Sequence, residues 1–67
     1  MNLYINGKTR HDLPDDLTVA ALLTELDLPL RKIAVERNRE VVPKSRFGEV
    51  RLAEGDRLEI IHFIGGG

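Results

Sequence analysis

The spacing of apolar and polar residues predicts that the chain opens with a β-hairpin. Residues 3–5 alternate between apolar and polar, and Asn6-Gly7 follows them. Asn-Gly favours a two-residue hairpin turn, because both residues tolerate a positive φ. The return strand is predicted over residues 8–13, and Pro14 ends it, because proline has no N–H to donate to a sheet.

A single amphipathic helix is predicted over residues 19–27. Thr18 is suited to the N-cap position, because its hydroxyl can accept a hydrogen bond from a free N–H of the first turn. The helix is expected to end near Asp27, since Pro29 disfavours the α conformation at the residue before it. Apolar residues spaced at i, i+3, i+4 and i+7 form one face of this helix, and they are Val19, Leu22, Leu23 and Leu26.

Alternation returns after the helix and predicts strands over residues 33–37, 40–42 and 57–63, with Asn38-Arg39 as a turn between the first two. The apolar face of a single helix must be covered by the sheet. We therefore expect an α+β fold in which the helix packs on one face of a mixed sheet of roughly four or five strands. The predicted core consists of Leu3, Ile5, Leu13, Leu17, Val19, Leu22, Leu23, Leu26, Ile33, Val35, Val42, Phe47, Leu52, Leu58 and Ile60.

Length and composition limit the classes of protein to which this chain can belong. The chain has 67 residues, no cysteine and a formal net charge of −1. A chain of this size buries only about 60% of its unfolded surface, so we expect one small domain. The absence of cysteine excludes disulfides, cysteine-zinc sites and iron–sulfur clusters, and it suits the cytoplasm. The charge argues against nucleic acid as the main partner. The sequence has neither a signal-peptide pattern at its start nor a run of roughly 20 apolar residues that could span a membrane.

The chain closes on three glycines, Gly65, Gly66 and Gly67. Glycine has no side chain to pack and loses the most backbone entropy when ordered, so we predict a folded domain over residues 1–64 followed by a free glycine tail. Three extended residues reach roughly 10 Å, far enough to thread a narrow channel in another protein. We therefore predict that the carboxylate of Gly67 enters the active site of a partner protein. A frayed end or a cloning remnant is the alternative.

The last strand predicts a surface for that partner. If Leu58 and Ile60 face the core, the period of two points Ile61 and Phe63 outward. An exposed apolar pair on a small domain indicates an interface. We therefore predict partner binding through Ile61, Phe63 and Ile64. Cover by a loop and self-association are the alternatives.

No other residues predict chemistry of their own. His11 and His62 lie on different predicted strands, and no acid or serine stands at a spacing that suggests catalysis. Asp12, Asp15 and Asp16 could hold a metal ion, but helix N-termini favour acidic residues, so a turn and dipole role is the better interpretation. We predict no catalytic residue and no metal site in this chain.

Short motifs run in order along nearly the whole chain: Ile5-Asn6-Gly7, Leu17-Thr18-Val19 with Leu22-Leu23, Ala34-Val35-Glu36-Arg37-Asn38, Val41-Val42-Pro43, Glu54-Gly55-Asp56, Leu58-Glu59-Ile60-Ile61 and His62-Phe63-Ile64-Gly65-Gly66-Gly67. As a set they resemble the ubiquitin-like β-grasp fold and, within it, the ThiS family of sulfur carriers. Arg39 departs from the family pattern, which often has glycine after the asparagine. This turn is therefore expected to differ from the Asn-Gly type.

The resemblance implies a mechanism in which the chain is a protein co-substrate and not an enzyme. A ubiquitin-activating-like, ThiF-like adenylyltransferase would adenylate the carboxylate of Gly67, using ATP and Mg that belong to that enzyme. A sulfur donor protein would then convert the adenylate to a thiocarboxylate, and a ThiG-like thiazole synthase would consume the sulfur for the thiazole ring of thiamin. The chain itself is expected to bind no cofactor.

Related functions stay open on the sequence alone. A MoaD-like carrier would feed molybdopterin synthesis by the same tail chemistry, and the short length and the Phe-Ile-Gly-Gly-Gly ending favour ThiS over it. A ubiquitin-like tag would share the activation step. A TGS-like β-grasp binding module has no use for a glycine run at its end, and that feature discriminates against it.

Overall fold

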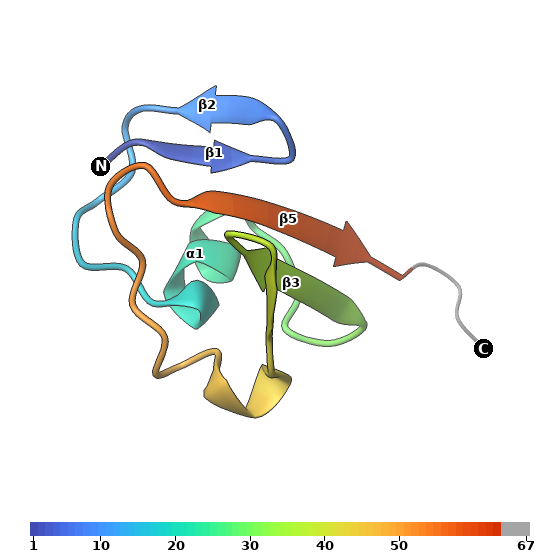
Figure 1. Cartoon of the computed structure of the whole chain (residues 1–67). Helices are drawn as coiled ribbons and strands as arrows, with labels where there is room; N and C mark the ends of the chain where they lie inside the picture. Colours follow the sequence, from blue (N-terminus) through green and yellow to red (C-terminus); the bar gives the residue numbers. More distant parts are fainter. Residues whose placement is uncertain (64–67) are drawn as a thin grey trace.

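The computed structural model describes residues 1–63. It contains a five-stranded mixed sheet with one α-helix on one face (Figure 1), which confirms the expected α+β architecture. The elements are β1 (Leu3–Ile5), β2 (Lys8–Arg10), α1 (Val19–Glu25), β3 (Ile33–Arg37), β4 (Glu40–Val42), the short 3-10 helix η1 (Lys44–Arg46) and β5 (Arg57–His62).

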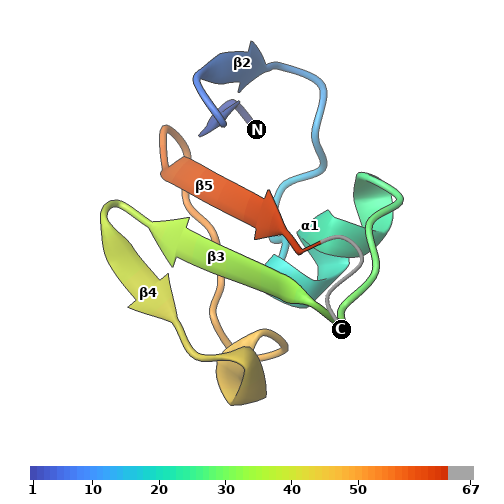
Figure 2. The same cartoon turned by 90° about the vertical axis from the view of Figure 1, so that its right-hand side faces the viewer.

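The last strand in the sequence, β5, lies in the middle of the sheet. The strand order is β2-β1-β5-β3-β4, and β5 runs parallel to β1 and antiparallel to β3. Figure 2 shows β3 between β5 and β4. Because both edges of β5 have neighbours and α1 covers one face, Leu58 and Ile60 are buried, with 1% and 8% of their surface exposed.

The two-residue turn after β1 and the one after β3 both have two consecutive residues with positive φ. Asn6 and Gly7 have φ values of 50° and 81°, as the Asn-Gly pattern predicts. Asn38 and Arg39 have φ values of 51° and 71°, so the expectation that Arg39 would change the turn type is wrong. The Asn38 backbone N–H donates to the Arg57 carbonyl at 2.7 Å, and this tertiary bond holds the turn although Arg39 is a poor residue for a positive φ.

The helix begins as predicted and ends earlier than predicted. The Thr18 hydroxyl accepts from the Ala21 N–H at 3.1 Å, which confirms Thr18 as the N-cap. The helix stops at Glu25 because Asp27 takes a left-handed φ of 60°. The Leu28 N–H then donates to the Leu23 carbonyl at 2.8 Å, which is the long bond of a Schellman cap. This local cap, before Pro29, ends the helix.

The core matches the prediction with one exception. All the predicted core residues are buried except Leu26, which is only partly buried because it is the C-cap residue and no longer part of the helix. The strand β2 ends at Arg10 and not at residue 13, because its partner β1 begins at Leu3, opposite Arg10. Leu13 is nevertheless buried in the loop beyond the strand.

Candidate functional site: the outer face of the sheet and the end of β5

The apolar pair at the end of β5 is exposed, as the alternation predicts. Ile61 is 54% exposed and Phe63 is 52% exposed, whereas the core residue Ile60, directly before Ile61, is buried. Ile61 lies opposite Ala34 of β3 on the face that points away from α1. Within residues 1–63 no loop covers this pair, so an apolar surface is available where the chain leaves the sheet.

We call the sheet face opposite α1 the outer face. At one end of it the Arg57 guanidinium stacks 4.7 Å from the centre of the Tyr4 ring. In the middle, Glu36 and Glu59 lie directly opposite each other in the β3–β5 register. Neither carboxylate has an ion-pair partner among the described residues. The outer face is therefore acidic in its middle and apolar beside Ile61. Like charges directly opposite each other on a sheet are destabilising.

The end of β5 is held by the neighbouring strand on one edge and by a side chain on the other. On the β3 edge, the Phe63 N–H donates to the Lys32 carbonyl at 2.7 Å. On the β1 edge, Asn6 Nδ2 donates to the Ile60 carbonyl at 3.1 Å and Asn6 Oδ1 accepts from the Ile60 N–H at 2.7 Å. The sequence predicted Asn6 only as a turn residue. No local signal reveals this contact, because Asn6 and Ile60 stand 54 residues apart.

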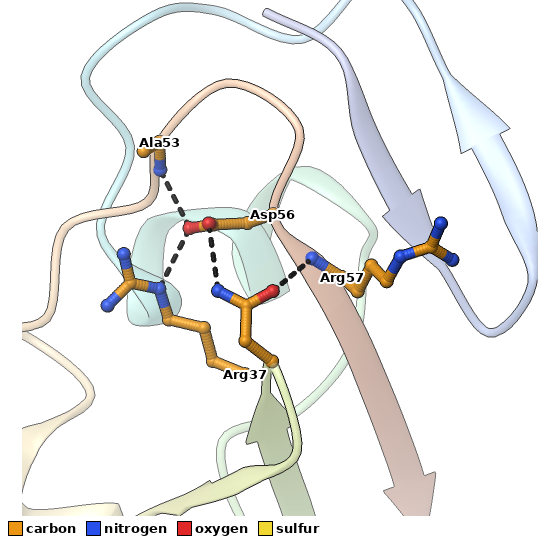
Figure 3. Close-up of polar contacts among 5 residues, drawn as sticks. Arg37, Ala53, Asp56 and Arg57 are labelled. Atoms are coloured by element: carbon orange, nitrogen blue, oxygen red, sulfur yellow. Dashed lines mark hydrogen bonds and ion pairs between the residues drawn. The ribbon is translucent and has the colours of Figure 1, made fainter.

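A buried carboxylate holds the beginning of β5 (Figure 3). Within residues 1–63, Asp56 is the one buried charged side chain, with 7% of its surface exposed. Its Oδ2 accepts from Arg37 Nε and from the Ala53 N–H, both at 2.8 Å, and its Oδ1 accepts from Asn38 Nδ2 at 3.1 Å. The sequence motif Glu54-Gly55-Asp56 predicted a turn here and did not reveal the buried ion pair.

The hydrogen bonds of Asp56 compensate its charge and lower the pKa of its carboxyl. Burial, the largest influence, raises the pKa of this carboxyl, but the hydrogen bonds from Ala53, Arg37 and Asn38 together outweigh it and hold the pKa below the ordinary aspartate value. Because Asp56 precedes the first residue of β5, this network lies at the opposite end of the strand from Phe63. It therefore orders the beginning of β5 and not the end of the strand that leads to the last residues of the chain.

The remaining titratable residues make isolated contacts. His11 Nδ1 lies 3.2 Å from Asn2 Oδ1, and His62 is exposed at the end of β5. Asp15 lies 3.4 Å from the N-terminal amine, and Asp16 pairs with Arg51. Both acids lie in the bend before the Thr18 cap, which confirms the predicted turn role for them, but neither lies in the first helical turn, so the predicted dipole role is wrong. In the part of the chain that the structure describes, no group of three or more histidines or acids could hold a metal ion.

Some of the predicted site lies outside the described residues. These are Ile64 as a partner contact, Gly65 and Gly66 as the tail, and Gly67 as the modified residue, together with the predicted domain boundary after residue 64. They stay predictions. No helix within residues 1–63 combines the length and hydrophobicity needed to cross a membrane.

Comparison with known proteins identifies relatives of two lengths. The sequence is 54% identical over 67 residues to a thiazole synthase of Paramagnetospirillum magneticum, covering all of this chain but 20% of that protein. It is 42% identical over 65 residues to the sulfur carrier protein ThiS of Bacillus subtilis, covering 97% of this chain and 98% of that one. A second thiazole synthase, from Magnetococcus marinus, is 42% identical, and the chain again spans 20% of its length.

The fold has a close counterpart among solved structures. The crystal structure of the thiamine biosynthesis protein ThiS from Geobacter metallireducens matches with a TM-score of 0.83 and 36% identity, covering 100% of both chains. This match confirms the ubiquitin-like β-grasp fold. The sequence model of the ThiS family matches residues 3–67, which include the glycines at the end of the sequence. The chain therefore belongs to the ThiS family.

Proposed function

We propose that this chain is a sulfur carrier of thiamin biosynthesis whose Gly67 carboxylate is adenylated and then converted to a thiocarboxylate. The observation that carries the proposal is the family match over residues 3–67, supported by the nearly full-length likeness to the Bacillus subtilis sulfur carrier. The proposal takes Gly67 as the residue that bears the reactive carboxylate. The chain acts as a co-substrate, and its place of action is the cytoplasm.

The chemistry follows from the weak reactivity of a carboxylate. A carboxylate oxygen of Gly67 attacks the α-phosphorus of ATP and releases pyrophosphate, which leaves AMP as a good leaving group on the carbonyl. A hydrosulfide ion, HS⁻, delivered by a sulfur donor protein then attacks the carbonyl carbon, the bond to AMP breaks, and loss of the S–H proton leaves the thiocarboxylate. ATP and Mg are bound by a ThiF-like adenylyltransferase, so this chain needs to supply only an unhindered terminus and a docking surface.

The outer face beside the end of β5 supplies that docking surface in the proposal. Ile61 and Phe63 are more than half exposed at 54% and 52%, and apolar side chains in such a position are typical of protein interfaces. Ile64 continues the same segment. A partner that binds Ile61 and Phe63 meets the chain at the last described residues, and in the sequence one further residue, Ile64, separates Phe63 from the glycines.

A ThiG-like thiazole synthase is the proposed consumer of the sulfur. Two proteins named thiazole synthase contain a segment that matches the whole of this chain, at 54% and 42% identity. A carrier segment and a synthase in one polypeptide are expected to work on each other, because a covalent link raises their effective concentration. These matches favour thiazole formation over the MoaD-like, molybdopterin alternative and over a non-reacting TGS-like module.

Intact-mass measurement tests the proposal. The protein is incubated with ATP, Mg, a sulfur donor and an activating enzyme that converts the Bacillus subtilis carrier, which serves as the positive control. We expect the mass change of one oxygen-to-sulfur exchange at Gly67, and ATP–pyrophosphate exchange that depends on the carrier. A variant lacking Gly67 should be inactive, since removing a residue withdraws the carboxylate by about 3.3–3.6 Å. Conversion of that variant at the parent rate, or no conversion of the parent, would refute the proposal.

A further inference from the structure

Two asparagines hold β5 from opposite edges in the same way. Each occupies the first position of a two-residue turn and has a positive φ, 50° at Asn6 and 51° at Asn38. Asn6 Oδ1 accepts from the Ile60 N–H at 2.7 Å, and Asn38 Oδ1 accepts from the Arg57 N–H at 3.0 Å. The two contacts lie at different ends of the strand, because Arg57 begins β5 and Ile60 is near its end.

The Asn6 contact extends the sheet beyond the end of β1. The ladder between β1 and β5 ends at the pair Ile5 and Leu58. The Asn6 side chain then takes the place of a further strand residue, because its amide donates to the Ile60 backbone at 3.1 Å and accepts from it at 2.7 Å. On the other edge the ladder with β3 continues to His62. Among the described residues, β5 is therefore held on both edges as far as Ile60 and on one edge beyond it.

We propose that Asn6 is a positioning residue for the adenylation of Gly67. The inference rests on the proposed function. By fixing β5 at Ile60, the Asn6 amide sets the direction in which Ile61 and Phe63 are presented to the activating enzyme and in which the chain continues toward its reactive end. Without this contact the end of β5 depends on the β3 ladder alone. The carboxylate then reaches the reactive geometry less often, and displacements of about 1 Å can lower a rate by roughly a hundredfold.

The structure offers a matched pair of variants for the test. Glycine accepts a positive φ, so Asn6→Gly and Asn38→Gly both keep their turns. Each variant removes only the hydrogen bonds that the asparagine side chain makes. Asn38→Gly is the more disruptive of the two for the fold, because Asn38 Nδ2 also donates to the buried Asp56 carboxylate. A loss of rate caused by lower stability would therefore be larger in Asn38→Gly. Asn6→Asp is a third variant that keeps an acceptor for the Ile60 N–H and loses the donor to the Ile60 carbonyl.

Amide hydrogen exchange reports whether the hydrogen bonds between the Asn6 side chain and the Ile60 backbone are lost locally. In Asn6→Gly the Ile60 N–H should exchange faster, because its acceptor is gone. The Ile61 N–H points to the other edge, as the Phe63 N–H does toward Lys32, and should stay protected. The Ile60 and Ile61 amides are compared within the same variant, because global unfolding exposes both of them equally.

Kinetics of adenylation then separate positioning from stability. With the ThiF-like enzyme saturated by carrier, we expect kcat for Asn6→Gly to fall about tenfold, with Asn6→Asp between it and the parent, and Asn38→Gly to stay within about twofold of the parent. Equal rates for Asn6→Gly and Asn38→Gly would overturn the positioning role while leaving the carrier function intact. Absence of adenylation in the parent itself would instead refute the proposed function.

Discussion

Replacing Asp56 by asparagine tests whether a buried carboxylate, in addition to strand pairing, holds the beginning of β5. An asparagine oxygen can keep the place of Oδ2, which accepts from Arg37 Nε and the Ala53 N–H at 2.8 Å. Its amide N–H₂ would then face Asn38 Nδ2, which is also a donor. The substitution therefore turns the bond from the Ala53 N–H into a neutral one, leaves the Arg37 guanidinium with an uncharged acceptor, and converts the third contact into an unfavourable donor–donor pair.

The magnitude follows from these three contacts. A hydrogen bond to a charged group is worth about 1.5–3 kcal/mol and a neutral one about 0.5–1.5 kcal/mol, so the weakened bond from Ala53 costs about 1 kcal/mol and the lost bond from Asn38 about 2 kcal/mol, together about 3 kcal/mol. The smaller desolvation of a neutral amide offsets part of this loss, which leaves a destabilisation of about 2 kcal/mol. A domain of this size has a total stability of only about 3–5 kcal/mol, so the variant should unfold at a markedly lower urea concentration.

The assay is urea denaturation followed by far-ultraviolet circular dichroism, with Glu40→Gln as the control because Glu40 is exposed. The control should change the free energy of unfolding by less than about 0.5 kcal/mol. An Asp56→Asn variant as stable as the parent at pH 7 would refute the stabilising role of the carboxylate.

The pH dependence of the same comparison has a definite sign. The folded-state pKa of Asp56 lies below its ordinary value, because hydrogen bonds from Ala53, Arg37 and Asn38 outweigh the opposing effect of burial. A depressed pKa stabilises the fold fully above the unfolded-state value, roughly pH 4, and this stabilisation is lost as the pH falls through the folded-state value. The stability difference between the parent and Asp56→Asn should therefore be largest near neutral pH and shrink below about pH 4. A difference that stays constant down to about pH 2 would contradict this reasoning.

Three further predictions concern the core, a strained turn and the docking surface. Leu22→Ala removes a side chain that is 0% exposed and should cost about 2–5 kcal/mol, so a melt close to that of the parent would show that the helix face is not buried as described. Arg39→Gly should stabilise the protein by about 0.5–1 kcal/mol in urea titrations, because relief of the left-handed strain exceeds the entropy that glycine loses; a destabilised variant would contradict this. Phe63→Asp should weaken calorimetric binding to the activating enzyme and leave the melt unchanged, since a carboxylate buried at an interface without a partner is unfavourable. Val41→Asp, which changes a side chain 70% exposed away from the end of β5, is its control, and equal binding by both variants would place the docking surface elsewhere.

Local patterns in the sequence were sufficient to predict the five strands, the single α-helix and the core apart from Leu26. Asn6-Gly7 predicted its turn because two consecutive positive φ values suit these residue types. Thr18 predicted the start of the helix because its hydroxyl reaches the N–H three residues on. Alternation along β5 separated buried Ile60 from exposed Ile61, because successive side chains of a strand point to opposite faces. These signals depend only on neighbours in the chain, so they can be read without the fold.

Contacts between distant segments were decided by the tertiary structure alone. Asp56 is an ordinary turn residue in the sequence, and it becomes a buried ion because β3 and the following turn bring Arg37 and Asn38 to it. Arg39 takes a positive φ because Asn38 is bonded to the start of β5. Asn6 clamps Ile60 because the sheet places β1 beside a strand that is 54 residues away in sequence. In each case the local preference of one residue is weaker than several hydrogen bonds formed across the sheet, and those bonds exist only once the chain has folded.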